Sequence, residues 1–226
     1  MANKSNGAIG KAYQYLREGI LSGELALGSP ISEMEISEKL KISRSPIREA
    51  LRRMESEGLV YRYPGRGTFV TNITQRDLEE IFELRIMFEV QALNTACQHF
   101  DPEFLDALER DFTYLNPDSH PQQYYDANAR LHRGIIAYAG NERMAKFYRQ
   151  LQAQIAIVNR ISARDPEHFV LSREKHLAIV RALKTHDLEE ARKQLQKHLE
   201  EVRDRTIKEY VESIPLERNP LLRNSR

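Results

Sequence analysis

Residues 43–54 read Ser-Arg-Ser-Pro-Ile-Arg-Glu-Ala-Leu-Arg-Arg-Met, and this stretch decides the fold of the first part of the chain. Its apolar residues recur at the spacing of one helix face, so it predicts an amphipathic helix that continues to Gly58. Ser43 or Ser45 can cap this helix at its start. Pro46 is tolerated there, because the first turn of a helix does not need its missing N–H group.

Two further helices are predicted before this stretch. Residues 8–22 carry apolar side chains at helical spacing, and Gly23 ends that helix. A short connection through Gly28-Ser29-Pro30 follows. Ser32 and Glu35 then form the S-x-x-E pattern of a capping box, which predicts a second helix of about two turns.

The periodicity changes after the third predicted helix. Residues 59–63 and 67–71 are rich in β-branched and aromatic residues, and they flank the turn signal Pro64-Gly65-Arg66. We expect a small β-hairpin there. Three short helices followed by a hairpin match a winged helix-turn-helix, whose later helix lies in the major groove of DNA while the hairpin touches an adjacent groove.

The polar face at the start of the third helix suits DNA recognition. Arg44 and Arg48 lie one turn apart on it, and arginine can donate two hydrogen bonds to O6 and N7 of guanine. Ser43 and Ser45 can reach phosphates or base edges, together with the amides at the helix start. Arg66, between two glycines at the hairpin tip, can approach the DNA backbone or the minor groove closely.

The alternative for these arginines is a solvated helix face. Net charge does not separate the two interpretations, because residues 1–75 hold eleven Lys/Arg and eight Asp/Glu, hence +3, and the remainder of the chain carries −2. The order of the elements is more specific. A short helix, a turn, an arginine-headed helix and a glycine-rich hairpin in one small domain favour DNA binding.

After Thr74 the strand pattern does not return. Helical periodicity runs through residues 75–99, 102–115, 120–139, 142–163, 168–185 and 187–213. The sequence therefore predicts a mainly α protein. We expect a winged helix-turn-helix domain over 1–75, an all-α bundle of about six helices over 76–213, and a C-terminal tail over 214–226.

Composition excludes several classes of protein. Hydrophobic residues make up 41% and charged residues 30% of the chain, which is enough apolar material for a core and too much charge for a membrane protein. The single cysteine, Cys97, can form neither an internal disulfide nor a cysteine-based zinc finger. No export signal or stretch of about 18 apolar residues is present, so we expect a cytoplasmic protein with no membrane partner.

Three histidines lie on the inward faces of predicted bundle helices: His132, His176 and His198. Any one of them alone is more often a hydrogen-bonded core residue than a ligand, and this alternative stays open. Three from separate helices, with Asn128 one turn before His132, can converge inside a bundle, where imidazole suits Zn, Ni, Fe or Mn. Tyr124 is interpreted as a packing or surface residue.

Four segments of the N-terminal part form one pattern: residues 35–40, 43–55, 57–60 and 64–70. They resemble the DNA-binding domain of the GntR family of transcription regulators. In that family the arginines of the S-R-x-P-x-R-E segment and the glycine-flanked wing tip contact operator DNA, and the resemblance assigns these roles to Arg44, Arg48, Gly65 and Arg66. Some members also use a basic residue in the preceding helix, where this chain has Ser32-Glu33-Met34-Glu35.

Residues 76–212 carry a second pattern, formed by Glu83-Leu84-Arg85 with Glu89, Asn128-x-x-Leu131-His132 with Gly140-Asn141, Glu174-Lys175-His176, and His198. This part is similar to the FCD ligand-binding domain of the FadR-like branch of GntR regulators. Members of that branch often bind a divalent metal through an Asp or Asn, a His four residues later and two further histidines. The resemblance therefore implies Asn128, His132, His176 and His198 as metal ligands.

The implied ligand set is neutral, because Asn128 stands where many members have Asp. A metal bound by neutral ligands keeps its full charge and open positions, which suits a small carboxylate. The E-L-R arginine of the family lies by the effector pocket, which implies effector binding by Arg85. An internal salt bridge of Arg85 with Glu89 or with a neighbouring helix is the alternative.

Together, the patterns indicate a homodimeric transcription regulator that reads a palindromic double-stranded operator and senses a small carboxylate at a metal site. Most relatives are repressors released by their effector, so the resemblance implies a repressor. A regulator for which the ion itself is the signal is one alternative. A small metallohydrolase is another, but no H-E-x-x-H motif, glycine-rich phosphate loop or G-x-S-x-G elbow appears, and we expect no enzyme.

Overall fold

The structure is a computed structural model that describes residues 2–115, 119, 121–162 and 166–213. The expected tail, residues 214–226, lies outside the described residues. The chain divides into two compact units. The winged-helix unit comprises Met1–Thr74 with Arg149–Arg160, and the helical unit comprises Gln75–Tyr148 with Ile161–Arg226.

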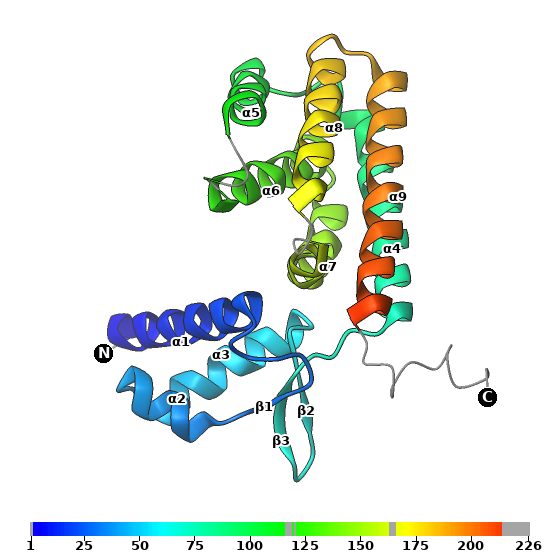
Figure 1. Cartoon of the computed structure of the whole chain (residues 1–226). Coiled ribbons are helices and arrows are strands. Elements are labelled where there is room, and N and C mark those ends of the chain that lie inside the picture. The colour runs from blue at the N-terminus through cyan, green and yellow to red at the C-terminus, as the bar shows by residue number, and fades with distance from the viewer. Residues whose placement is uncertain (1, 116–118, 120, 163–165, 214–226) are drawn as a thin grey trace, which may run out of the picture. The chain divides into compact units, whose positions relative to one another are not determined.

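The winged-helix unit contains helices and a small antiparallel sheet (Figure 1). Its elements are α1 (Ala2–Ser22), β1 (Pro30–Ile31), α2 (Glu33–Leu40), α3 (Arg44–Ser56), β2 (Val60–Tyr63) and β3 (Gly67–Val70). The predicted hairpin of β2 and β3 is confirmed. The sheet also contains β1, which pairs with β3 and was expected only as a connection, because two residues are too short to show a strand period.

Local capping and apolar spacing explain α2 and α3. The Ser32 side chain accepts a hydrogen bond of 3.2 Å from the Glu35 amide, as the predicted capping box requires. Ser43 is the N-cap residue of α3, although its side chain makes no capping hydrogen bond. The apolar face of α3 packs against α1. The buried residues of this contact include Ile47, Ala50, Leu51 and Met54 of α3 and Ala12, Leu16 and Ile20 of α1.

The helical unit is all-α, which confirms the predicted fold class (Figure 1). Its helices are α4 (Gln75–Ala96), α5 (Pro102–Tyr114), α6 (Pro121–Tyr138), the first part of α7 (Glu142–Ser162), α8 (Pro166–Lys184) and α9 (Leu188–Ser213). α4 packs along α9 and against α6, and α8 packs against α5 and α9. Among the described residues, no helix is both long and apolar enough to cross a membrane.

The core of the helical unit is mostly apolar and also contains polar side chains. Leu93, Leu131 and Ile179 are completely buried, as expected for inward-facing positions of a bundle. Among the described residues, the charged residues and histidines buried with them are Arg85, Glu89, His132, His176 and His198. Burying a charge or an imidazole costs folding free energy unless the group is paired or binds a ligand. This group is therefore the candidate functional site of the helical unit.

Candidate nucleic-acid interface and metal centre

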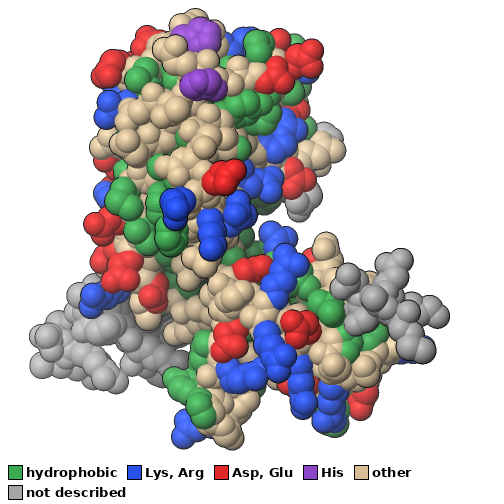
Figure 2. All heavy atoms as spheres, turned by 180° about the vertical axis from the view of Figure 1, so that it is seen from behind, with side chains coloured by type: hydrophobic (Ala, Val, Ile, Leu, Met, Phe, Trp, Pro, Cys, Tyr) green, Lys and Arg blue, Asp and Glu red, His purple; other side chains and the backbone are tan. Residues whose placement is uncertain are grey.

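The N-cap and the first two turns of α3 carry the polar residues that the sequence predicts for DNA contact. Ser43, Arg44, Ser45 and Arg48 are all exposed. The N-terminal end of a helix also carries unpaired amides and a partial positive charge, both of which favour a phosphate. Over the face of the molecule in Figure 2, however, Lys and Arg side chains of this unit lie among Asp and Glu side chains rather than in one basic patch.

Arg48 is held by an acidic partner from α2. Its Nε donates to Oε2 of Glu33 at 2.8 Å, and the Arg48 side chain is 56% exposed. An exposed ion pair of this kind contributes about 0–1 kcal/mol, because water screens both charges. Arg48 can therefore leave Glu33 for a phosphate or a guanine at small cost.

The tip of the β2–β3 hairpin places a cation between two flexible positions. Gly65 has φ +73° and Gly67 has φ +102°, conformations that glycine adopts without strain. The Arg66 amide donates to the Tyr63 carbonyl at 3.1 Å, which closes the turn around Pro64 and Gly65. Arg66 is exposed, and no heavy atom beyond the chain neighbours lies within 4 Å of a Cβ built on either glycine, so another backbone can approach this tip closely.

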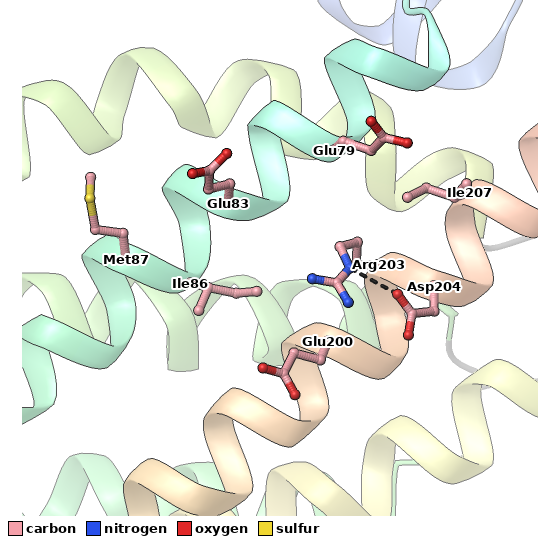
Figure 3. Close-up of a pocket in the computed structure, with 8 residues that line it drawn as sticks. All are labelled: Glu79, Glu83, Ile86, Met87, Glu200, Arg203, Asp204 and Ile207. Atoms are coloured by element: carbon pink, nitrogen blue, oxygen red, sulfur yellow. Dashed lines mark hydrogen bonds and ion pairs between the residues drawn. The ribbon is translucent and has the colours of Figure 1, made fainter.

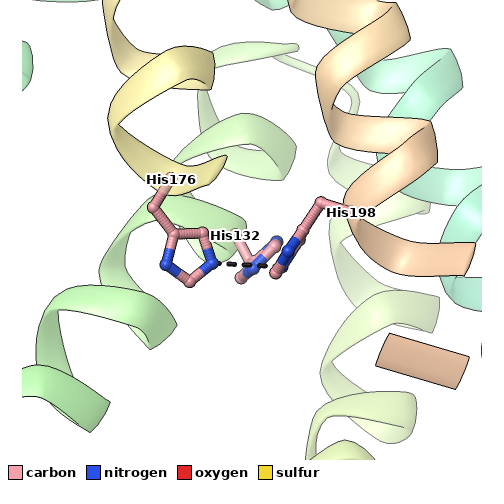
Figure 4. A group of neighbouring side chains, drawn as sticks. All are labelled: His132, His176 and His198. Atoms are coloured by element: carbon pink, nitrogen blue, oxygen red, sulfur yellow. Dashed lines mark hydrogen bonds between the residues drawn. The ribbon is translucent and has the colours of Figure 1, made fainter. Parts of the chain in front are cut away.

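The three predicted histidines meet inside the helical unit (Figure 4). His132 comes from α6, His176 from α8 and His198 from α9, and one ring nitrogen of each lies within 4.8 Å of the others. Their exposed fractions are 3%, 1% and 4%. Nε2 of His176 and Nε2 of His198 are 3.1 Å apart, so only one of the two carries the shared proton in the hydrogen bond.

His132 differs from the other two because one of its nitrogens has no partner. Its Nδ1 lies 2.5 Å from Oε2 of Glu89, while its Nε2 is buried and makes no hydrogen bond. Burial lowers the pKa of His132 below its usual value, against the opposing effect of the Glu89 charge. A neutral imidazole with a buried, unpaired nitrogen is an unsatisfied acceptor unless an ion or a polar ligand binds it.

Glu89 on α4 gathers three donors around one buried carboxylate. Oε1 accepts from Nε of Arg85 at 2.8 Å and from the Tyr148 hydroxyl at 2.6 Å, while Oε2 faces His132. Burial raises the pKa of Glu89, but His132, Arg85 and the hydrogen-bond donors outweigh it and lower that pKa to about 2. Burial and the neighbouring carboxylate raise the pKa of Tyr148 well above its usual value, so the tyrosine stays a donor.

The histidine cluster fits a divalent metal ion. His132, whose Nε2 makes no hydrogen bond, lies in a buried cluster of three imidazoles, and imidazole is a good ligand for Zn, Ni, Fe and Mn. Asn128 lies on α6 one turn before His132 and is half-buried, a position from which an amide oxygen can add a fourth ligand. The residues present therefore suit the predicted ligand set.

Arg85 forms the alternative interaction that the sequence left open, an internal salt bridge with Glu89 one helical turn later. Sequence reasoning did not find three other features. It did not pair Glu89 with His132 or place Tyr148 on Glu89, because these residues are 43 and 59 positions apart. It allowed Tyr124 to line the same cavity but favoured a packing or surface position; the side chain is buried, and its hydroxyl lies 3.2 Å from Nδ1 of His176.

A separate groove of about 620 Å³ lies between α4 and α9 (Figure 3). Four acidic residues line it together with Arg203, whose Nε donates to Oδ1 of Asp204 at 2.8 Å. None of the residues that line this groove belongs to the histidine cluster or to the predicted DNA-contact residues. The groove is therefore distinct from both candidate sites.

Comparisons with known proteins match both parts of the chain to known families. Residues 8–70 match the gntR family of bacterial regulatory proteins, and residues 80–201 match the FCD domain. The Nta operon transcriptional regulator of Aminobacter aminovorans is 30% identical over 159 residues, which cover 69% of this chain and 74% of the relative.

Two solved structures extend the comparison. The structure of E. coli McbR/YncC has the same fold, with a TM-score of 0.75 and 21% identity over 90% of this chain and 98% of that chain. The Zn²⁺-bound FCD domain of TM0439 is 25% identical, with a TM-score of 0.56 over 61% of this chain and 96% of that chain.

Proposed function

We propose that this chain, which belongs to the gntR family of bacterial regulatory proteins and carries an FCD domain, is a metabolite-responsive repressor. Such a protein is a DNA-binding transcriptional regulator. In our proposal it acts in the cytoplasm as a homodimer on a palindromic operator, because two half-sites on one duplex need two symmetry-related readers. Its signal is a small carboxylate that reaches a metal site in the helical unit.

The proposed DNA contacts lie on two elements of the winged-helix unit. Arg44 and Arg48 on the first two turns of α3 read base edges or phosphates, with Ser43 and Ser45 beside them. Gly65 and Arg66 at the wing tip contact the backbone or the minor groove. Exposure of all six residues supports these roles, and the weak pairing of Arg48 with Glu33 leaves that arginine available to DNA.

The observation that carries the sensing proposal is the buried nitrogen of His132 that has no partner. His132, His176, His198 and Asn128 would hold the divalent ion. That ion would supply a positive charge that neutral ligands do not cancel, and this charge attracts a small carboxylate. The FCD domain of TM0439 has been solved with Zn²⁺ bound, which supports zinc as the ion to test first.

Arg85 is the proposed second anchor for the effector. Its guanidinium has five N–H donors, and Nε donates to Glu89. An effector carboxylate would share this cation with Glu89 rather than replace it. Effector binding then shifts the equilibrium between two arrangements of the winged-helix units in the dimer, and so changes operator affinity through differential binding.

The test measures DNA affinity of the full chain, using a duplex selected by the protein from a random pool. Fluorescence anisotropy compares the metal-free protein, the protein with Zn²⁺, and the protein with Zn²⁺ plus members of a panel of small carboxylates. We expect one carboxylate with Zn²⁺ to weaken binding. A change with Zn²⁺ alone would make the ion the signal, and no change under any condition would contradict the sensing proposal.

His176→Ala serves as the matched variant. It should bind the same duplex with the affinity of the metal-free wild type and should not respond to Zn²⁺ or carboxylate. A retained response in this variant would place the sensor elsewhere.

A further inference from the structure

We infer that Glu89 is the positioning residue of the metal site: it fixes the proton of His132 on Nδ1, so that the lone pair of Nε2 faces the histidine cluster. This inference rests on the proposed metal site. Three observations carry it: the 2.5 Å contact of Glu89 with Nδ1, the unpaired Nε2 on the other side of the same ring, and the complete burial of Glu89.

The chemistry of the two partners determines which nitrogen carries the proton. A neutral imidazole has one N–H group and one acceptor nitrogen, and an ionised carboxylate can only accept. Nδ1 of His132 must therefore be the donor toward Glu89, and Nε2 must be the nitrogen without a proton. Only such a nitrogen can bind a metal ion.

Glu89 cannot turn away from this role, because its other oxygen is already fixed. Arg85 and Tyr148 both donate to Oε1, from α4 itself and from α7. Arginine cannot act as an acceptor, so Oε1 must remain an oxygen that faces Arg85. The carboxylate is 0% exposed, and no solvent competes for its hydrogen bonds.

The corresponding contact of His176 is less restrictive. Its Nδ1 faces the Tyr124 hydroxyl at 3.2 Å, and a hydroxyl can donate or accept. Tyr124 is therefore compatible with either tautomer of His176, whereas Glu89 is compatible with only one tautomer of neutral His132. The carboxylate thus supplies an orientation that a hydroxyl does not.

Glu89→Gln should move the ring proton of His132 from Nδ1 to Nε2. Glutamine offers one oxygen and one NH₂ group, and the buried Arg85 requires the oxygen. The NH₂ group would then face Nδ1 of His132 and donate to it, which moves the ring proton to Nε2. The variant should thus lose zinc affinity about 10- to 100-fold, the range typical when the hydrogen-bond partner of a metal-binding histidine is changed.

The single variant also leaves the charge of Arg85 buried without its partner, which can prevent folding. A matched pair of double variants avoids this problem. Arg85→Met with Glu89→Gln removes both charges and frees the amide oxygen to accept from Nδ1 of His132. Arg85→Met with Glu89→Leu removes the acceptor altogether. The first double variant should bind zinc about 10- to 100-fold more tightly than the second.

Two readouts test the inference on the full chain. Zinc affinity comes from competition with a chromophoric chelator, with Glu83→Gln on the exposed side of α4 as the control that should match the wild type. Long-range ¹H–¹⁵N spectra of the metal-free, histidine-labelled protein show which ring nitrogen of His132 carries the proton. The His132 signals are identified as those that are missing from the spectra of His132→Gln.

We expect protonated Nδ1 and unprotonated Nε2 for His132 in the wild type and in the Glu89→Gln double variant. Protonated Nε2 in the wild type, or equal zinc affinity in the two double variants, would overturn the inference. A wild-type chain that binds no zinc would instead contradict the proposed function, and the His132 tautomer would still decide whether Glu89 fixes the ring proton.

Discussion

The two units each contain an arginine–glutamate pair with the same Nε–Oε distance in different surroundings. Arg48 and Glu33 in the winged-helix unit, and Arg85 and Glu89 in the helical unit, are each joined by an Nε–Oε distance of 2.8 Å. The Arg48 side chain is 56% exposed, whereas that of Arg85 is 3% exposed. The Nε–Oε distance therefore does not distinguish the two ion pairs, whereas the exposed fraction of the arginine does.

The different exposure of the two pairs supports different proposed roles. In water the attraction between Arg48 and Glu33 is weak, so the arginine can exchange its partner for DNA. In the core, separating Arg85 from Glu89 would strand a charge, so that pair is permanent and can hold a third residue, His132, in place. The same two residue types thus make an exchangeable contact on one unit and a rigid support in the other.

The largest expected effect is on stability. Arg85→Met leaves the Glu89 carboxylate buried without its cation and should lower the free energy of unfolding by about 3–5 kcal/mol. Arg48→Met, the same substitution in the exposed pair, should change it by less than about 1 kcal/mol. Chemical denaturation followed by circular dichroism measures both. Similar losses for the two variants would remove the basis of the comparison.

The next effect concerns DNA. Arg48→Ala removes a side chain proposed to read the operator and should weaken binding to the selected duplex by about 1–3 kcal/mol, or roughly 5- to 150-fold. The matched control is Arg76→Ala, since Arg76 is an exposed, glutamate-paired arginine outside the winged-helix unit. Fluorescence anisotropy at fixed salt provides the affinities. If Arg48→Ala bound like the control, this residue would play no part in recognition.

A smaller effect should follow from changing the partner instead of the arginine. Glu33→Gln removes the charge that competes with DNA for Arg48, so DNA affinity should rise by up to about 1 kcal/mol, or about fivefold. Glu35→Gln, on the same helix and without a basic partner in the described ion pairs, is the control for a general change in charge. A gain in the control equal to that in Glu33→Gln would mean that long-range charge, and not the exchange of partners, sets the affinity.

The smallest effect concerns exposed ion pairs within the helical unit. Lys184 donates to Asp106 at 2.8 Å and to Glu109 at 2.6 Å, and these contacts lower the pKa of both carboxyl groups. Because the folded-state pKa lies below the unfolded one, the stabilisation is present above about pH 4.5 and is lost as the pH falls through the folded-state pKa.

Lys184→Met provides the measurement for these pairs. The difference in unfolding free energy between the wild type and this variant should be small at pH 7, smaller in high salt, and should shrink as the pH falls below about 4.5. A difference that grew on acidification would contradict the assigned direction of both pKa shifts.

Local patterns in the sequence were enough to predict much of the fold. The apolar spacing of residues 43–54 and the turn signal around Gly65 predicted α3 and the hairpin, because both depend on neighbours in the chain. β1 was not predicted, since its two residues form a strand only by pairing with β3. Helix ends differed from those that periodicity suggested in both directions: α4 ends at Ala96 and not at residue 99, whereas α1 begins at Ala2 and not at residue 8.

The candidate site was predictable only in part, for the same reason. His132, His176 and His198 could be selected because each follows the inward face of its own helix, and the structure brings them together. The pairing of Arg85 with Glu89 spans one helical turn and could be stated as an alternative. The contact of Glu89 with His132 depends on the packing of α4 against α6, which no local pattern encodes.

The most direct test of the histidine cluster is native mass spectrometry of the purified full chain after exposure to Zn²⁺ and removal of excess ion. The wild type and Arg48→Ala should each retain one zinc ion per chain, and His176→Ala should retain none. Full zinc occupancy in His176→Ala, or a wild type without zinc, would contradict the assignment of the buried histidines as a metal site.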